Sequence, residues 1–293
     1  MKNTFTRWAG TAALAVGVTL GSMGCAQAAD DTIEFGWTAW SDAEFVTKLA
    51  KTLIEDHTDY KVKLTLSAIG VQYQGVANGD LDGMLMAWLP DTHADYWERV
   101  KDDVVDLGTL YDGARLGWAV PDYIPEDELS SIEDLKKPAV VEMLGGKIQG
   151  IDPGAGLMQL SEKAMDTYDL NDDYRLVSAS GAAMTAALAR AEKRHEPIVV
   201  TGWTPHWMFG RWNLRFLDDP DGTLGEAQHV DVVVRKGFED DYPDVAKFLS
   251  NMHIPLEGLQ ASMDEAQKTS YDDAIKNWID AHPDTIKEWF GES

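Results

Sequence analysis

The chain has 293 residues, which is enough to bury one large hydrophobic core or two medium ones. It carries 50 acidic and 25 basic residues, so its formal net charge is −25 at pH 7. Because binding to phosphate groups requires clusters of Lys and Arg, this balance argues against nucleic acid or an anionic lipid surface as a partner.

The first 28 residues have the pattern of an export signal peptide. Lys2 and Arg7 form a basic region, residues 9–23 form an apolar run, and Ala-Gln-Ala at 26–28 is a small-residue cleavage site. The apolar run is too short and too rich in Gly and Thr for a membrane span. Cleavage after Ala28 would remove Cys25, the single cysteine, and with it any disulfide or thiol chemistry. Lipid anchoring at Cys25 is the weaker alternative, because position 22 lacks the expected Leu. Both alternatives take the protein out of the cytoplasm, and we expect a periplasmic location.

Strands and helices alternate after the signal. The hydrophobic pattern predicts strands at residues 33–37, 61–66 and 81–89, separated by helices at 43–55 and 72–78. Ser41 is the expected N-cap of the first helix, followed by an acidic first turn. This alternation is typical of an α/β sheet with crossover helices.

A strand at residues 116–121 stops at a proline, and the polar segment 122–137 indicates a change of domain. A second α/β unit follows, with strands at 146–151 and 198–203 and helices at 157–168 and 182–193. A strand at 229–234 returns the chain to the first unit, and two helices at 244–252 and 271–281 close the sequence. We therefore expect two α/β lobes joined by two crossing strands. Residues 30–118 and 231–293 would form lobe 1, and residues 119–230 would form lobe 2.

Three of the predicted strands run out at a tryptophan: Trp40, Trp88 and Trp203. Open α/β sheets bind ligands at the carboxyl ends of their strands, which predicts that these indoles share one recognition surface. A quaternary ammonium has no N–H to donate, but an aromatic face stabilises its charge by about 0.5–2 kcal/mol. Each tryptophan taken singly would be a core residue. Together they predict a cage for a methylated cation. Seven others are assigned to packing, with Trp207 as the first exception to consider: Trp37, Trp97, Trp118, Trp207, Trp212, Trp278 and Trp289.

A glycine-rich turn at residues 150–157, Gly-Ile-Asp-Pro-Gly-Ala-Gly-Leu, leads into a predicted helix. Free backbone N–H groups at a helix start favour an anion, either a carboxylate or a phosphate. The turn matches neither the nucleotide P-loop nor the dinucleotide fingerprint. His93, five residues beyond Trp88, is a candidate hydrogen-bond donor to a carboxylate, and His206 is a weaker one. Beside a cation cage, these groups predict a zwitterionic ligand.

The sequence offers no pattern typical of catalysis. Its seven histidines lack metal-ligand spacing such as His-Glu-x-x-His, and neither a Gly-x-Ser-x-Gly elbow nor a cysteine nucleophile is present. The acidic residues are scattered through predicted helices, where a solvated face is the expected position. We expect no catalytic residue, metal or cofactor.

Three motifs resemble the glycine betaine-binding proteins of ABC-type osmoprotectant importers. They are Trp-Leu-Pro-Asp-Thr-His at 88–93, Gly-Ile-Asp-Pro-Gly-Ala-Gly-Leu-Met at 150–158 and Thr-Gly-Trp-Thr-Pro-His-Trp-Met at 201–208. The resemblance extends over about residues 32–252. It implies a two-lobed periplasmic-binding-protein fold, type II-like, whose cleft closes on the ligand and hands it to a permease in the inner membrane.

The family's site residues can be carried over by motif. Its three cage tryptophans fall on Trp40, Trp88 and Trp203, with Trp40 in the loosest of the matching motifs. Its carboxylate site falls on the backbone amides of Gly156 and Leu157 and on His93. Some members carry the two halves in swapped order, so lobe boundaries must be read from this chain.

The resulting expectation is an exported, monomeric receptor for glycine betaine or a close relative. Dimethylsulfoniopropionate, proline betaine, carnitine and choline are alternative ligands that would use the same cage. A choline-ester hydrolase is an alternative of a different class, and it would need a nucleophile and a base that the sequence does not supply.

Overall fold

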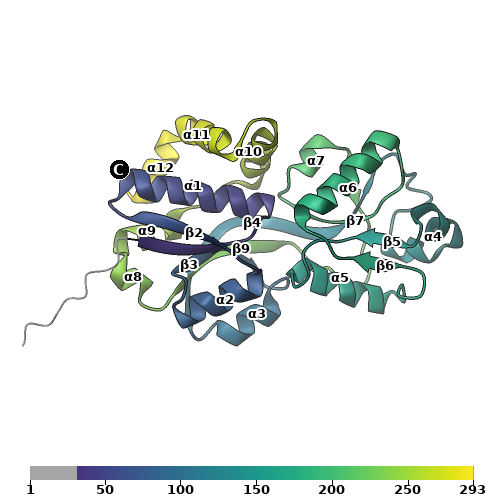
Figure 1. The fold of residues 1–293 in the computed structure, drawn as a ribbon, viewed down its shortest axis with the longest axis horizontal. Coiled ribbons are helices and arrows are strands. Elements are labelled where there is room, and N and C mark those ends of the chain that lie inside the picture. The colour runs from purple at the N-terminus through teal and green to yellow at the C-terminus, as the bar shows by residue number, and fades with distance from the viewer. Residues whose placement is uncertain (1–31, 293) are drawn as a thin grey trace, which may run out of the picture.

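The structure is a computed structural model, and residues 32–292 are described. The predicted export signal, with Cys25 and the cleavage site after Ala28, lies outside the described residues. The elements gather in two groups along the long axis of the molecule (Figure 1). We call the group around β1–β3 lobe 1 and the group around β5–β7 lobe 2. The predicted residue boundaries at 118/119 and 230/231 stay a prediction.

Nine strands form one sheet that runs through both lobes, in the order β2-β1-β3-β9-β4-β7-β5-β6 with β8 on β4. In lobe 1, β1 (Thr32–Trp37) pairs in parallel with β2 (Lys61–Leu66) and β3 (Gly83–Leu89), and β9 (Gln228–Arg235) is antiparallel to β3. Lobe 2 holds β5 (Lys147–Gln149), β6 (Arg175–Val177), β7 (Val200–Thr204) and β8 (Leu214–Phe216).

The 18-residue strand β4 (Val104–Pro121) connects the lobes. Its first part, from Val104 to Ala114, pairs with β9, and its second part, from Arg115 to Ala119, pairs with β7. The sequence pattern predicted only the second part, from residue 116. Because β4 belongs to both lobes, the carboxyl ends of β3 and β7 face one another across the junction (Figure 1).

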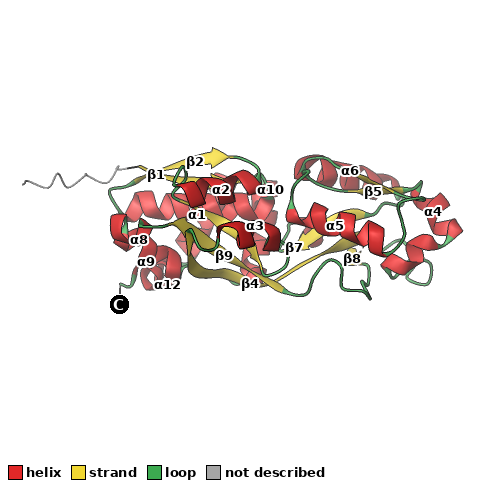
Figure 2. Ribbon diagram, turned by 90° about the horizontal axis from the view of Figure 1, so that it is seen from below, coloured by secondary structure: helices red, strands yellow, loops and turns green. Residues whose placement is uncertain are grey.

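Helices cover both lobes, as the view from below also shows (Figure 2). Lobe 1 carries α1 (Ser41–His57), α2 (Ile69–Asn78), α3 (Ala94–Val100), α8 (Phe238–Asp241), α9 (Pro243–Asn251), α10 (Leu256–Lys268), α11 (Tyr271–Ala281) and α12 (Pro283–Phe290). Lobe 2 carries the 3₁₀ helix η1 (Ile132–Lys136), α4 (Pro138–Leu144), α5 (Gly156–Thr167), α6 (Gly181–Arg194) and α7 (Met208–Arg211). No helix among residues 32–292 is long and apolar enough to cross a bilayer.

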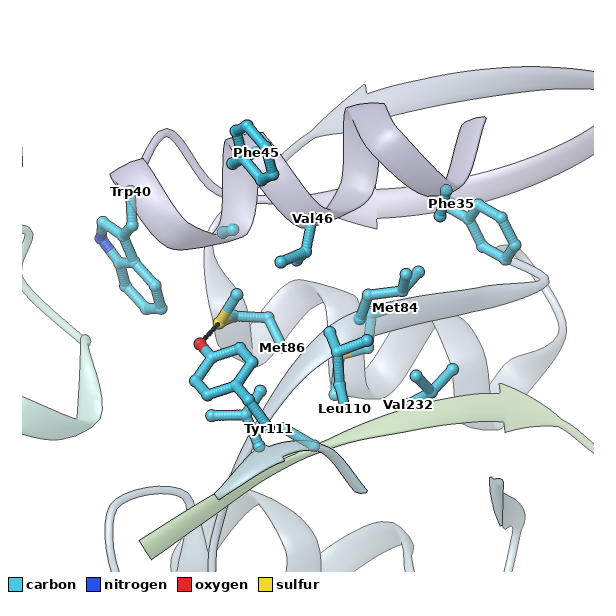
Figure 3. Packing of buried hydrophobic residues seen from close by; sticks show 14 of the residues in the cluster. Phe35, Trp40, Phe45, Val46, Met84, Met86, Leu110, Tyr111 and Val232 are labelled. Atoms are coloured by element: carbon cyan, nitrogen blue, oxygen red, sulfur yellow. Dashed lines mark hydrogen bonds between the residues drawn. The ribbon is translucent and has the colours of Figure 1, made fainter. Parts of the chain in front are cut away.

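The core of lobe 1 lies between α1 and the sheet. Phe35 from β1, Val46 from α1 and Met84 from β3 are fully buried, and in Figure 3 they lie above Leu110 of β4 and Val232 of β9. Burying such a side chain contributes about 1.5–3 kcal/mol. A second cluster in lobe 2 surrounds Trp118 and Ile148. Each lobe therefore carries apolar packing of its own.

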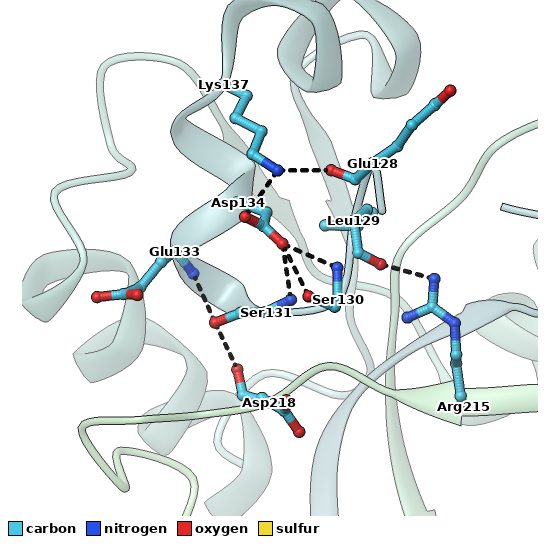
Figure 4. A network of polar contacts seen from close by, with 9 residues as sticks. All are labelled: Glu128, Leu129, Ser130, Ser131, Glu133, Asp134, Lys137, Arg215 and Asp218. Carbon is cyan, nitrogen blue, oxygen red and sulfur yellow. Dashed lines mark hydrogen bonds and ion pairs between the residues drawn. The ribbon is translucent and has the colours of Figure 1, made fainter. Parts of the chain in front are cut away.

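The polar segment predicted to mark a change of domain is anchored on lobe 2. The Asp134 carboxylate accepts hydrogen bonds from the backbone N–H groups of Ser130 and Ser131, and the bond from Ser131 is part of a capping box at the start of η1 (Figure 4). The same carboxylate forms an ion pair with Lys137. Partial burial would raise the pKa of Asp134, but these bonds outweigh it and lower that pKa to about 2. Arg215 of β8 donates to the carbonyl of Leu129 and fixes the same segment.

Two expectations about helices were wrong. The sequence predicted two closing helices, whereas the structure has four of eight or more residues after β9: α10 and α12 were missed. Pro283 is the first residue of α12, and proline fits a helix start well. Helix α1 begins at Ser41 itself, its N-cap is Trp40, and no side chain caps it. Ser41 is therefore inside the helix and is not its cap.

Candidate functional site

A small cavity lies between the lobes. All six residues predicted to bind the ligand line it: Trp40, Trp88, His93, Gly156, Leu157 and Trp203. They come from both lobes and from positions far apart in the chain. The structure therefore brings together the whole predicted set at one place.

The three tryptophans are almost completely buried, with 3–7% of each exposed. The indole N–H of Trp40 donates to Asp152 Oδ2 at 3.2 Å, and that of Trp88 lies 3.1 Å from the sulfur of Met86. The indole N–H of Trp203 donates to Asp42 Oδ1 at 3.1 Å. Since the polar edge of each ring has a partner, the rings present apolar and π surface to the cavity, which is the surface that a methylated cation requires.

Asp42 is a site residue that sequence reasoning missed. It is the second residue of α1, it is fully buried, and its carboxylate accepts from the Tyr111 hydroxyl at 2.8 Å as well as from Trp203. Burial raises the pKa of Asp42 to about 6, against the opposing effect of these hydrogen bonds. The expected solvated position was wrong for this acid. Its place two residues after Trp40 was the one available signal.

Tyr111 was missed as well. It is fully buried on β4, and its ring meets that of Trp88 edge to face, with centroids 6.4 Å apart and an interplanar angle of 85°. Burial, the charge of Asp42 and the hydrogen bond to it hold the pKa of Tyr111 well above its usual value. The hydroxyl therefore stays protonated and donates a hydrogen bond to Asp42. Tyr111 and Asp42 together form a polar layer directly behind Trp88 and Trp203.

The other end of the cavity is built from backbone. Gly156 and Leu157 are the first two residues of α5, and the intrahelical hydrogen bonds begin only after them, with the amides of Met158 and Gln159 donating to the carbonyl of Ala155. The N–H groups at a helix start have no partner within the helix and attract an anion. A Cβ at Gly156 would lie 2.1 Å from the Thr92 carbonyl oxygen, so only glycine allows lobe 1 to approach this closely.

His93 lies beside these amides with 1% of its surface exposed. Its Nδ1 is 3.1 Å from the backbone N–H of Trp88, which can only donate, so Nδ1 must accept and the neutral ring carries its proton on Nε2. Burial lowers the pKa of His93 to about 3, and the ring is therefore neutral at physiological pH. Nε2 is consequently a hydrogen-bond donor suited to a carboxylate.

His206 and Trp207 lie outside the cavity lining. Nδ1 of His206 accepts from the backbone N–H of Met208 at 3.0 Å, and its ring packs edge-on against Trp203 with centroids 4.5 Å apart. Trp207 packs against Trp212 at 5.4 Å. His206 therefore contacts Trp203 directly, and Trp207 packs against His206, with ring centroids 5.3 Å apart. Among residues 32–292, no group of three or more His, Cys, Asp or Glu side chains could hold a metal ion.

Comparison with known families gives one clear match. The family model described as the substrate binding domain of ABC-type glycine betaine transport systems matches residues 31–281. A glycine betaine/carnitine transport binding protein of Listeria monocytogenes is 41% identical over 150 residues, which is 50% of this chain and 50% of that protein. A glycine betaine/proline betaine-binding periplasmic protein of Salmonella typhimurium is 25% identical over 259 residues, or 76% of this chain and 78% of the relative.

Solved structures agree. Lactococcal OpuAC in its closed form with glycine betaine superposes with a TM-score of 0.82 at 37% identity, covering 89% of this chain and all (100%) of that one. A choline-binding protein of an ABC transporter, in complex with choline, gives 0.80 at 28% identity, covering 88% and 91%. These matches confirm the expected α/β two-lobed periplasmic-binding-protein fold.

Proposed function

The chain belongs to the family of substrate-binding domains of ABC-type glycine betaine transport systems, and we propose that it captures glycine betaine between its lobes. The observation that carries this proposal is the two-ended cavity. One end is walled by three indoles, and the other end offers the N–H groups at the start of α5 and the neutral imidazole of His93. A trimethylammonium group suits the first end, and a carboxylate suits the second.

In this proposal Trp40, Trp88 and Trp203 surround the cation, while the amides of Gly156 and Leu157 and Nε2 of His93 bind the carboxylate. Trp40 and Trp88 belong to lobe 1, and Trp203 belongs to lobe 2, so the cage is complete only when the lobes close. Closure would bury the ligand and give the protein a surface that an ABC permease recognises. Binding and delivery, and no chemical conversion, are then the whole activity.

Choline is a second candidate, favoured by one observation. The buried Asp42 carboxylate lies against Trp203 and gives this part of the site a negative charge. A zwitterion brings its own carboxylate, whereas choline is a net cation and gains more from Asp42. The similarity to a choline-binding protein is compatible with this alternative.

We further propose that residues 1–28 act as an export signal and that the protein works as a monomer in the periplasm, beside a permease of the inner membrane. The basic, apolar and small-residue regions of this segment support export. Cleavage after Ala28 would release the receptor, whereas lipidation at Cys25 would tether it. Mass spectrometry of the exported protein separates the two outcomes.

Calorimetric titration of the purified exported protein tests the ligand proposal. Glycine betaine should bind at one site per chain and more tightly than choline or dimethylsulfoniopropionate. Tighter binding of choline would move the assignment to the second candidate. The absence of saturable binding by any of the three would overturn the receptor proposal, and turnover of a choline ester by the same protein would overturn the view that it only binds.

A further inference from the structure

Tyr96 connects the two lobes from a place outside the ligand cavity. It lies on α3 in lobe 1, and its hydroxyl donates to the carbonyl oxygen of Gly154 in lobe 2 at 2.6 Å. The same hydroxyl accepts from Nε2 of Gln159, on α5, at 2.8 Å. Tyr96 is not among the residues that line the cavity. Its two hydrogen bonds therefore join the lobes without a contact to the proposed ligand.

The two partners of Tyr96 lie on either side of the proposed carboxylate donors. Gly154 precedes Gly156 in the glycine-rich turn and has a φ of +87°, while Gln159 follows Leu157 in the first turn of α5. A shift of this turn by a fraction of an ångström would change the distance from the amides to His93. Tyr96 is thus placed to hold the turn and the helix start against lobe 1.

The Tyr96 ring is itself held firmly on lobe 1. It stacks on Tyr73, with centroids 5.7 Å apart and an interplanar angle of 13°, and a Cβ at Gly70 would lie only 2.8 Å from its Cε1 atom. The Tyr73 hydroxyl in turn lies 3.3 Å from Nδ1 of His93. The group that fixes Tyr96 therefore also touches the proposed histidine donor.

We propose that Tyr96 is a positioning residue that locks the glycine-rich turn onto lobe 1 in the closed state and so sets how long the ligand stays bound. The proposal rests on the proposed function, because it concerns the same site. Both hydrogen bonds of Tyr96 cross the cleft, so they exist only when the lobes are closed. Interactions that favour the closed state alone shift the open–closed equilibrium toward it and slow ligand release.

The test is a stopped-flow measurement of glycine betaine binding by tryptophan fluorescence, on wild type, Tyr96→Phe and Gln159→Leu. Each net hydrogen bond contributes a factor of about 2–12, so the loss of both in Tyr96→Phe should raise koff by about 4- to 140-fold. The rate constant kon should stay within about twofold, because the first encounter occurs with the open form. In the double variant Tyr96→Phe/Gln159→Leu, the rise in koff should be smaller than the product of the two single rises, since both substitutions remove the same Tyr96–Gln159 bond.

Tyr123→Phe is the matched control. The Tyr123 hydroxyl donates to the Glu196 carbonyl at 2.8 Å, a bond of the same kind that stays within lobe 2. Its loss should leave both rate constants unchanged. An unchanged koff in Tyr96→Phe, or an equal rise in Tyr123→Phe, would overturn the proposal while the proposed function stands.

If wild type itself fails to bind glycine betaine, the proposed function fails and the latch is tested separately. Dyes on cysteines introduced at one exposed position of each lobe report the interlobe distance by energy transfer. Tyr96→Phe should then shift the ligand-free chain toward longer distances than Tyr123→Phe does. Identical distance distributions would overturn the role of Tyr96.

Discussion

The two ends of the cavity are built in opposite ways. The proposed cation end consists of large side chains, and each indole N–H has a partner behind it: Asp152, Met86 or Asp42. The proposed carboxylate end consists mainly of backbone, with the N–H groups of Gly156 and Leu157 at the start of α5. Ligand contacts at the first end depend on the identity of the side chains. Ligand contacts at the second end depend on how closely lobe 1 approaches the start of α5, and therefore on the absence of a side chain at Gly156.

This difference determines how each end should fail. A substitution at the cage removes a contact and leaves the closed conformation accessible. A substitution at Gly156 adds atoms where lobe 1 already lies, and so opposes closure itself. The largest effect is therefore expected at the smallest residue.

Gly156→Ala should weaken glycine betaine binding most, by about 100-fold. The added methyl group would lie 2.1 Å from the Thr92 carbonyl, and such overpacking costs about 1–3 kcal/mol. Gly258→Ala on α10 is the matched control, because a Cβ there meets nothing within 4 Å. Calorimetric Kd values give the answer, and equal affinity of Gly156→Ala and wild type would show that the lobes need not approach at this point.

Trp203→Ala should reduce affinity by about 30-fold, because it removes an aromatic face worth up to about 2 kcal/mol to a desolvated cation. It also leaves the Asp42 carboxylate without one of its two side-chain donors. Trp203→Phe keeps a π face and should lose clearly less. Fluorescence titration of the two variants compares them, and equal losses would show that Trp203 acts only through packing.

His93→Phe should lower affinity for glycine betaine by about tenfold or more, because a hydrogen bond to a charged group contributes about 1.5–3 kcal/mol. Phenylalanine keeps the ring but removes the Nε2 donor. It also unpairs the N–H of Trp88, so choline serves as the control ligand. A loss that is equal for choline and glycine betaine would assign His93 to structure and not to carboxylate binding.

The smallest expected effect is a pH dependence of choline binding, and it tests the proposed cation end alone. Burial raises the pKa of Asp42 to about 6, so its carboxylate takes up a proton as the pH falls through 6. Choline binding should therefore weaken by up to about tenfold between pH 7 and pH 5. The pKa of His93 is lowered to about 3 and cannot cause this change. Asp42→Asn should abolish the pH dependence, and its persistence in that variant would assign it to another group.

The same pKa has the opposite consequence for stability. The folded-state pKa of Asp42 lies above the unfolded value of 3.8, so the ligand-free folded state binds the proton more tightly. This group therefore adds stability as the pH falls from about 6 toward about 4. Asp231, on β9, also has its pKa raised to about 6 by burial. The stability of Asp42→Asn should therefore still depend on pH in this range through Asp231.

Much of the fold was predictable because its signals are local. Hydrophobic periodicity placed β1, β2 and α11, and the strand-end rule grouped Trp88 and Trp203, which line the same cavity at the facing carboxyl ends of β3 and β7. Helices α10 and α12 were not found, because both begin at or directly after a proline that reads as a stop. Local sequence patterns therefore predicted the elements whose starts and ends carry ordinary signals, and missed α10 and α12.

Of the proposed site, only residues that line the cavity were predicted from the sequence. Tryptophans at strand ends and a glycine-rich turn are visible in the chain, but the groups that orient them are not. Asp42 meets Trp203 over 161 positions, and Tyr96 meets Gly154 over 58. Such pairs depend on how the two lobes close, and no periodicity in the sequence records that geometry.

The central claim is that the three indoles recognise positive charge and not only shape. Replacing the nitrogen of glycine betaine by carbon gives 3,3-dimethylbutanoate, which keeps the carboxylate and the three methyl groups but lacks the cation. Calorimetric titration of both ligands at one pH tests the claim most directly. We predict that the carbon analogue binds at least about tenfold more weakly, because cation–π attraction is lost. Equal affinities would contradict the cation cage and leave a cavity that selects by shape and carboxylate alone.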